Sequence, residues 1–207
     1  MLLENLFFPP KCPFCGEVIG RSKAVCDKCV RYLQIAPHKQ ILPNECVCAS
    51  LFRHEGVWRT AVINYKFYNN RQYYFQFSLM LSDAVKNVYS GKSFDFYTSV
   101  PIHKKRLESR GFDQVKLLAR QTAKFNGCVY KPFLKQCQQS EVQHYLSKEK
   151  RSSNVKGIYK SVSQEQIQGR SILLFDDIVT TGSTLLECSD VLLNAGASEV
   201  CCVTINW

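Results

Sequence analysis

Two adjacent acids and a run of small hydroxyl residues follow one apolar segment near the C-terminus. Ile172–Phe175 is suited to a buried strand of a parallel sheet, and apolar residues return at helical spacing from Leu185. Asp176 and Asp177 follow this strand, at the edge where open α/β sheets bind ligands. The loop between the acids and the helix contains Thr180, Thr181, Gly182, Ser183 and Thr184.

This arrangement favours a phosphorylated sugar as the ligand. Successive backbone N–H groups of a small-residue loop at a helix N-terminus can bind a phosphate. The two carboxylates would repel that phosphate unless they face a cation or sugar hydroxyls, so a ribose phosphate with Mg²⁺ meets both requirements. The phosphate-binding motif GxxxxGK[ST] is absent from the sequence, which argues against a P-loop ATPase.

Ile172–Thr184 resembles the signature with which type I phosphoribosyltransferases bind phosphoribosyl pyrophosphate (PRPP). The resemblance implies that Asp176 and Asp177 contact the ribose hydroxyls and that Thr180–Thr184 bind the 5′-phosphate. The alternative is an ordinary strand, turn and helix in which Asp177 is a surface acid.

Two C-x-x-C pairs lie near the N-terminus. Cys12, Cys15, Cys26 and Cys29 can form a tetrahedral zinc site, and a site closed by four thiolates is structural, since it leaves no position for a substrate. Four reduced cysteines or an iron–sulfur cluster are the alternatives. Cys46-Val47-Cys48 is too closely spaced for a second pair of this kind, and we interpret both of its cysteines as structural.

Basic residues are concentrated in the segment that precedes the acids. Residues 101–170 contain fifteen Lys and Arg against five Asp and Glu, whereas the rest of the chain contains twelve of each. Such an excess suits polyphosphates or nucleic acid, and a solvated basic face without a partner is the alternative. Within this segment, Lys104 and Lys105 are the candidate contacts to nucleic acid.

Several further elements are expected to surround these groups. Helices are expected at 57–67 and 72–89, and a strand at 94–100 followed by a basic loop. Arg106 and Arg110 of this loop are the candidate catalytic residues, because they could stabilise a departing pyrophosphate. Lys66 and Arg151 are further candidates, and Asp113 can cap the next helix.

A second resemblance covers nearly the whole chain. Val100-Pro101, Arg110-Gly111-Phe112-Asp113-Gln114, Asn154-Val155-Lys156-Gly157 and the acid motif, led by a cysteine module, resemble the ComF family of bacterial competence proteins. The usual Arg-Gly-Phe-Asn-Gln has Asp113 in place of Asn here. The resemblance implies a role in natural transformation, and the polar segment 140–160, which includes Gln143, resembles the mobile segment that closes over phosphoribosyltransferase sites.

These observations predict an α/β fold: a type I phosphoribosyltransferase-like parallel sheet flanked by helices, with a small N-terminal four-cysteine zinc module. We expect the module and a linker at 1–45 and the larger domain at 46–207. No apolar run approaches the length of a membrane span, and the N-terminus lacks the basic start of a signal peptide. We therefore expect the protein in the cytoplasm, with the surface of the inner membrane as a further location.

Two functions fit the sequence. In one, a PRPP-binding protein acts in natural transformation, in the uptake and cytoplasmic handling of single-stranded DNA, with the inner-membrane uptake machinery as its partner. In the other, an active phosphoribosyltransferase transfers ribose 5-phosphate from PRPP to an unidentified base or amine acceptor. Both require a structural Zn²⁺ and a Mg²⁺ bound with PRPP.

Overall fold

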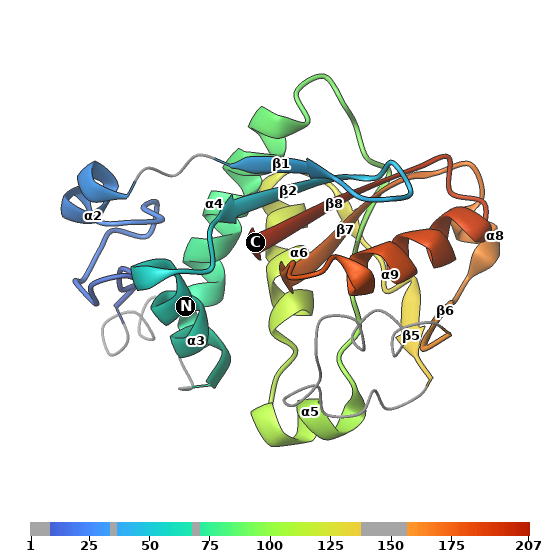
Figure 1. Ribbon diagram of the computed structural model, residues 1–207. Coiled ribbons are helices and arrows are strands. Elements are labelled where there is room, and N and C mark those ends of the chain that lie inside the picture. Colours follow the sequence, from blue (N-terminus) through green and yellow to red (C-terminus); the bar gives the residue numbers. More distant parts are fainter. Residues whose placement is uncertain (1–8, 34–36, 68–70, 138–156) are drawn as a thin grey trace.

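A mixed sheet forms the centre of the molecule in the computed structural model, which describes residues 9–33, 37–67, 71–137 and 157–207 (Figure 1). Its strands are β1 (His38–Ile41), β2 (Val47–Phe52), β3 (Phe96–Ser99), β4 (Val129–Tyr130), β7 (Ser171–Ile178) and β8 (Glu199–Asn206). Their order in the sheet is β1-β2-β8-β7-β3-β4. All neighbours pair in parallel except β1 and β2, which are antiparallel, so β1 forms an antiparallel edge.

The two central strands are buried along most of their length. Ile172–Phe175 of β7 and Val200–Ile205 of β8 are fully covered, as their near-continuous apolar sequences predict. β7 is longer than its apolar run, however, and continues through the two acids to Ile178. It does so because its ladder with β8 continues, with Asp176 opposite Thr204 and Ile178 opposite Asn206. The acids therefore lie at the carboxyl end of the strand, as predicted, and still within its ladder.

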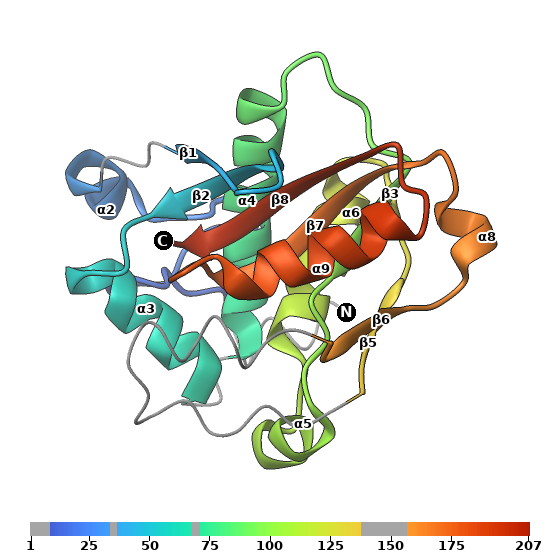
Figure 2. The ribbon, with the colours of Figure 1, turned by 45° about the vertical axis from the view of Figure 1, so that its right-hand side comes forward.

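Helices cover both faces of the sheet (Figures 1 and 2). α3 (Gly56–Phe67), α4 (Tyr74–Val88) and α6 (Gln114–Phe125) pack on one face, against Leu173 and Phe175. α8 (Gln164–Ile167) and α9 (Ser183–Asn194) pack on the other, against Ile172 and Leu174. Since successive residues of a strand point to opposite faces, one stretch of β7 contributes to both cores.

Short elements connect this framework. α2 (Asp27–Tyr32) belongs to the cysteine module, η1 (Arg71–Tyr73) precedes α4, and β5 (Leu134–Gln136) pairs antiparallel with β6 (Tyr159–Ser161). The proposed boundary between residues 45 and 46 lies in the turn between β1 and β2, two strands that pair with each other.

The segment after β3 differs from its prediction as a basic loop, because Lys104–Arg110 forms the helix α5. His103 caps its start, since the backbone N–H of Lys105 donates to the imidazole Nδ1 at 3.2 Å. Gly111 ends it in the left-handed conformation with φ of 73°, which a glycine adopts without strain. At the edge of the sheet next to β3, β4 is limited to two residues.

Candidate functional site

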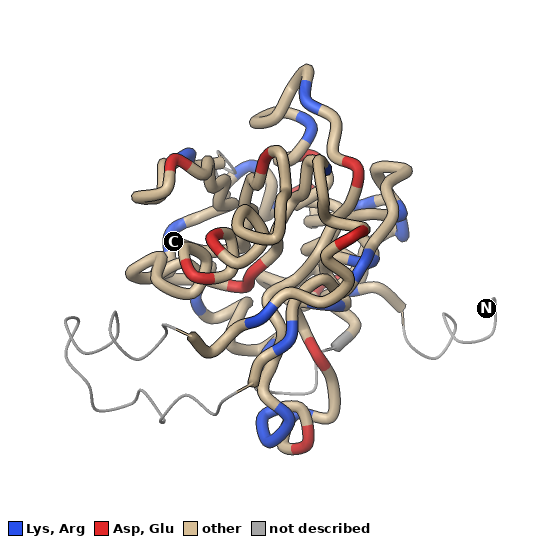
Figure 3. The backbone as a smooth tube through the Cα atoms, turned by 90° about the vertical axis from the view of Figure 1, so that its right-hand side faces the viewer, with Lys and Arg blue, Asp and Glu red and all other residues tan. Residues whose placement is uncertain are grey.

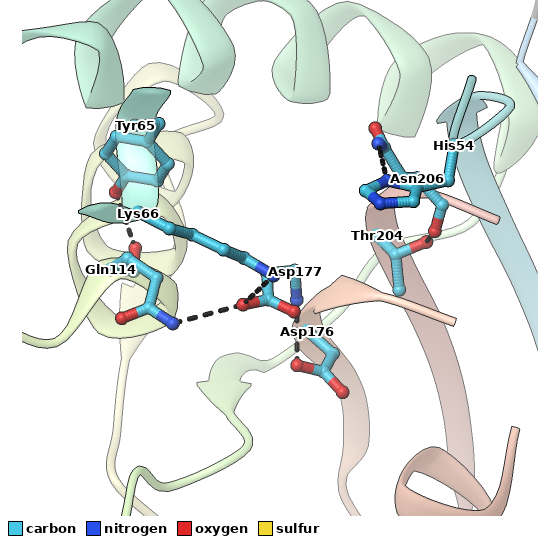
Figure 4. Close-up of polar contacts among 8 residues, drawn as sticks. All are labelled: His54, Tyr65, Lys66, Gln114, Asp176, Asp177, Thr204 and Asn206. Carbon is cyan, nitrogen blue, oxygen red and sulfur yellow. Dashed lines mark hydrogen bonds and ion pairs between the residues drawn. The ribbon is translucent and has the colours of Figure 1, made fainter. Parts of the chain in front are cut away.

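The two acids of β7 lie side by side but face different surroundings (Figure 4). Asp177 is only 8% exposed, so it is not a surface acid, and it points toward α3 and α6. Asp176 is half-buried and points the other way. The backbone N–H of Asp177 donates to Asp176 Oδ1 at 2.8 Å, and this hydrogen bond holds the Asp176 carboxyl group against the end of β7.

Asp177 is held by side chains from two helices. Lys66 Nζ at the end of α3 lies 2.9 Å from Asp177 Oδ2, and both side chains are little exposed, at 13% and 11%. Gln114 Nε2, from the first residue of α6, donates to the same oxygen at 3.0 Å. The Tyr65 hydroxyl donates to the backbone carbonyl of Gln114 at 2.8 Å and so joins α3 to α6. Figure 4 shows these groups converging on one carboxylate.

These contacts separate the acidities of the two acids. Burial and the neighbouring charge of Asp177 raise the pKa of Asp176 to about 8. Burial alone would also raise the pKa of Asp177, but the charge of Lys66 and the hydrogen bonds from Lys66 and Gln114 lower it overall. Near neutral pH the pair therefore favours one ionised carboxylate and one carboxylic acid that can both donate and accept a hydrogen bond.

A second cation and an unpaired acceptor lie near this pair. Arg110, at the end of α5, is half-buried; burial lowers the pKa of its guanidinium, and attraction to Asp177 opposes that shift. The amide oxygen of Gln114 is buried and has no hydrogen-bond partner within the described part of the chain. An unpaired buried acceptor is costly, so a hydroxyl of a ligand would be favoured beside it.

The predicted phosphate loop connects β7 to α9. Gly182, the residue before α9, has φ of 75°, and a Cβ at this position would lie 3.2 Å from Leu42 Cδ2. The backbone conformation therefore favours glycine, and a larger residue would also require the Leu42 side chain to shift. Thr180 and Thr181 are exposed, and the Thr181 and Ser183 hydroxyls are 2.8 Å apart. The loop thus presents hydroxyl groups at the N-terminus of a twelve-residue helix, next to the acid pair.

The other predicted basic residues of α5 are more exposed than Arg110. Lys104, Lys105 and Arg106 are exposed, whereas Arg110 is half-buried and its charge lowers the pKa of Asp177. Figure 3 shows Lys and Arg along several parts of the described backbone, with a group at the lower end of the molecule, where α5 lies. Three of the four basic residues of α5 are therefore accessible to a ligand or partner.

The four predicted zinc ligands form one cluster. The sulfurs of Cys12, Cys15, Cys26 and Cys29 all lie within 4.8 Å of one another. A tetrahedral site with Zn–S bonds near 2.3 Å places its sulfurs roughly 3.8 Å apart, so the donor set fits a structural zinc.

The local backbone explains why the sulfurs converge. Gly16 has φ of 77° and donates its N–H to the Cys12 carbonyl at 2.9 Å, which closes the first turn. Cys26 caps α2, and its sulfur accepts the backbone N–H of Cys29 at 3.3 Å.

The other cysteines do not extend the metal cluster among the described residues. Cys46 and Cys48 are buried in the core on the α9 side of the sheet, as their structural interpretation requires. Burial raises the pKa of the Cys48 thiol to about 11, which keeps it protonated near neutral pH.

Two partners of Asp177 carry little signal in the sequence. Lys66 was expected to act on pyrophosphate but forms an ion pair with Asp177, and Gln114 is recognisable only as part of the motif that begins at Arg110. Both contacts arise from packing of α3 and α6 on one sheet face.

Some predictions lie outside the described residues. These are most of the segment 140–160, with Gln143, Arg151, Asn154 and Lys156. Among the described residues, none of the helices combines the length and the apolar character that crossing a bilayer requires.

Two family models match the chain in separate segments. A double zinc ribbon domain matches residues 3–41, and a phosphoribosyl transferase domain matches residues 133–206. The first contains all four clustered cysteines, and the second contains β7, the acid pair, the hydroxyl loop and α9. The matches confirm the predicted fold class, a phosphoribosyltransferase-like sheet with an N-terminal zinc module.

Similar proteins support the same relationship. "DNA utilization protein YhgH" of Salmonella typhi is 35% identical over 107 residues, which is 51% of this chain but only 46% of that protein, so the match spans about half of that relative. "Competence protein F" of Haemophilus influenzae is 26% identical, covering 94% of this chain and 95% of that protein. "Competence protein ComFC" of Bacillus subtilis is 26% identical over 89% of this chain and 72% of that protein.

Among solved structures, the glutamine PRPP amidotransferase from B. subtilis has a TM-score of 0.47 at 19% identity, covering 69% of this chain and 30% of that one. The relatives that cover nearly the whole chain, together with the phosphoribosyl transferase match around the acid pair, confirm the resemblance drawn from the motifs. Over nearly its whole length, the chain is therefore similar to the competence proteins that the ComF resemblance indicated.

Proposed function

We propose that the protein binds PRPP with Mg²⁺ and acts in natural transformation, in the uptake and cytoplasmic handling of single-stranded DNA. The observation that carries the PRPP part is the acid pair at the end of β7, with one acid in an ion pair, directly before a hydroxyl loop at the N-terminus of α9. Only a ligand that combines an anion with hydroxyl groups uses both features.

Each part of PRPP has a partner in this arrangement. The ribose hydroxyls face Asp176 and Asp177, of which Asp176 can donate as well as accept while Asp177 is an acceptor held by Lys66. The 5′-phosphate takes the N–H and hydroxyl groups of Thr180–Thr184. The pyrophosphate faces Arg110, which already interacts with Asp177, and the exposed Arg106 on the same helix.

The donor set also suits magnesium. Mg²⁺ prefers carboxylate and phosphate oxygens, which the pyrophosphate would provide together with Asp176, whose proton the bound cation would displace. Asp177 is the less suitable ligand, because Lys66 already neutralises its charge at 2.9 Å. The ion would contribute neutralisation of the pyrophosphate charge.

The DNA part of the proposal rests on the relatives and on charge. Two relatives bear the name of competence proteins and a third that of a DNA utilization protein. Lys104 and Lys105 are exposed on α5 and suit sequence-independent contacts with the phosphates of single-stranded DNA. We place this activity in the cytoplasm, at the inner-membrane surface where an uptake machinery delivers single strands.

Phosphorus NMR tests the PRPP site directly. PRPP with Mg²⁺ is titrated with the wild-type protein, with Asp176→Asn/Asp177→Asn and with the control Asp83→Asn, which replaces an exposed acid on α4. We expect the wild type and the control to broaden the PRPP signals and the double variant to lose that effect. Equal binding by all three proteins would contradict the proposed site. Base-dependent release of pyrophosphate would identify an active transferase instead.

A salt titration tests the DNA surface. We compare Lys104→Ala/Lys105→Ala with Lys116→Ala/Lys124→Ala, a pair of exposed lysines on α6, for binding to a labelled single-stranded oligonucleotide. Loss of two phosphate contacts should reduce the slope of log K against log salt by about 1.4, because each contact on a single strand contributes roughly 0.7. An unchanged slope in the α5 variant, or an equal loss in the α6 variant, would exclude α5 as the DNA contact.

A further inference from the structure

The first cysteine turn of the zinc module packs directly on the larger domain. Phe14, between Cys12 and Cys15, makes an edge contact with Trp58 of α3 at a centroid distance of 4.7 Å and with Phe52 of β2 at 6.2 Å. The Phe52 and Trp58 rings stack on each other at 4.0 Å. The aromatic cluster thus joins a zinc-ligand turn to the start of α3.

The contact belongs to one continuous core. Cys12, Ile19, Val25 and Cys26 of the module lie in the same buried cluster as the apolar side chains of α3, α4 and α6. The module therefore shares a buried core with the helices that cover one face of the sheet.

The other end of α3 reaches the acid pair. Ala61, Val62 and Tyr65 bury one side of this twelve-residue helix, and Lys66 in its last turn forms the ion pair with Asp177. α3 is thus anchored at its start by Phe14 and near its end by Tyr65 and Lys66. A shift of the first anchor moves the second, because a helix of this length behaves as a rigid rod.

We propose that the zinc module is a positioning element of the PRPP site: Phe14 packs on Trp58, and this contact sets the place of α3 and of Lys66 against Asp177. The inference rests on the proposed function, since it assumes that the acid pair binds PRPP. It assigns the module a role at the sugar-phosphate site in addition to any contact with DNA, and it makes Phe14 and Trp58 positioning residues that act through Lys66.

A mutant cycle tests this route. Phe14→Ala should weaken PRPP binding about fivefold, the equivalent of one edge-on aromatic contact, while the protein keeps one equivalent of zinc. The control is Phe75→Ala, which removes a half-buried ring from α4 that makes a similar edge contact with Phe125 at 5.2 Å. This control should leave PRPP affinity unchanged. In a Lys66→Gln background, Phe14→Ala should cause no further loss, because its effect passes through Lys66.

A second variant controls for the possibility that Phe14→Ala unfolds the zinc module. Trp58→Leu removes the same contact from the α3 side and leaves the cysteine turns intact, so it should reproduce the loss of affinity with full zinc content. Unchanged PRPP affinity in Phe14→Ala and Trp58→Leu would overturn the inference. So would an additive loss on top of Lys66→Gln, since that loss could not pass through Lys66.

Hydrogen exchange provides a readout without PRPP. Amides of residues 56–67 should exchange faster in Phe14→Ala than in Phe75→Ala, and unchanged exchange would overturn the inference. If the wild-type protein fails to bind PRPP, the proposed function fails, and the exchange measurement still decides whether the module holds α3.

Discussion

The zinc cluster and the acid pair differ in how far apart in the sequence their interacting residues lie. All four zinc ligands come from the single segment Cys12–Cys29, in two turns that form locally. Asp177 instead contacts Lys66 of α3 and Gln114 of α6, which are distant in sequence. Even the nearer of the two, Gln114, is 63 residues away from Asp177. The first site depends on a metal and two tight turns, and the second depends on the packing of the whole sheet.

The difference predicts how each site fails. Loss of a zinc ligand should disorder the cysteine turns, because they have little hydrophobic core of their own and depend on the metal for stability. Loss of Lys66 should leave the fold in place but leave the buried Asp177 carboxylate without its cation. The free-energy cost is set by the desolvation of that carboxylate. Four substitutions, from the largest expected effect to the smallest, can sharpen or break this contrast.

The largest effect is expected from Cys26→Ser. Zinc contributes on the order of 10 kcal/mol to the folding of small zinc domains, so loss of one ligand should abolish zinc binding and disorder the module. Zinc content and hydrogen exchange of residues 9–33 measure this, with the exposed Cys137→Ser as the control. The core between β7, β8 and α9 contains no module residue and should stay protected. One bound zinc in the variant would refute the assignment of this ligand.

Lys66→Met should lower the free energy of unfolding by about 3–5 kcal/mol, because it leaves the Asp177 carboxylate buried without its cation. Urea denaturation measures the change. Addition of Asp177→Asn should recover much of the loss by removing the unpaired charge. The control Lys92→Met breaks an exposed pair with Glu199 and should cost about 0–1 kcal/mol. Equal losses in the two single variants would mean that the Lys66 pair behaves as a surface contact.

Asp176→Asn should change the pH dependence of stability. The folded state raises the pKa of Asp176, so it binds this proton more tightly than the unfolded state does. The resulting stability is fully present below about pH 4 and is lost as the pH rises through about 8. The wild-type Tm should therefore fall relative to that of the variant between pH 5 and pH 9. Parallel Tm curves for wild type, Asp176→Asn and the control Asp83→Asn would contradict the raised pKa.

The smallest effect concerns the cap of α6, which positions Gln114. Asp113 Oδ1 accepts the backbone N–H of Lys116 at 2.9 Å, and Asp113→Ala should cost about 1 kcal/mol. Asp113→Asn keeps the cap and restores the residue usual in this motif of the ComF family, so it should be nearly neutral. Thermal denaturation distinguishes the two, and a large loss in the Asn variant would show that the carboxylate itself is needed.

The local features of the chain were predictable from the sequence. The apolar run of β7, the helix of residues 57–67, the Asp113 cap and the four clustered cysteines were all identified from spacing and residue type. The prediction of a loop at 104–110 was wrong. Its helix depends on the His103 cap and the Gly111 stop, which a count of basic residues does not reveal.

The sequence by itself determined which residues could carry the chemistry: the acid pair, the hydroxyl loop and the zinc ligands are contiguous motifs, because each performs its task through neighbours in the chain. Only the tertiary structure decided the state of those groups. The pKa of Asp177 is lowered and that of Asp176 is raised, because Lys66 and Gln114 contact Asp177 whereas burial and the charge of Asp177 act on Asp176. Such contacts form when helices distant in sequence pack on the same sheet face, which no local pattern records.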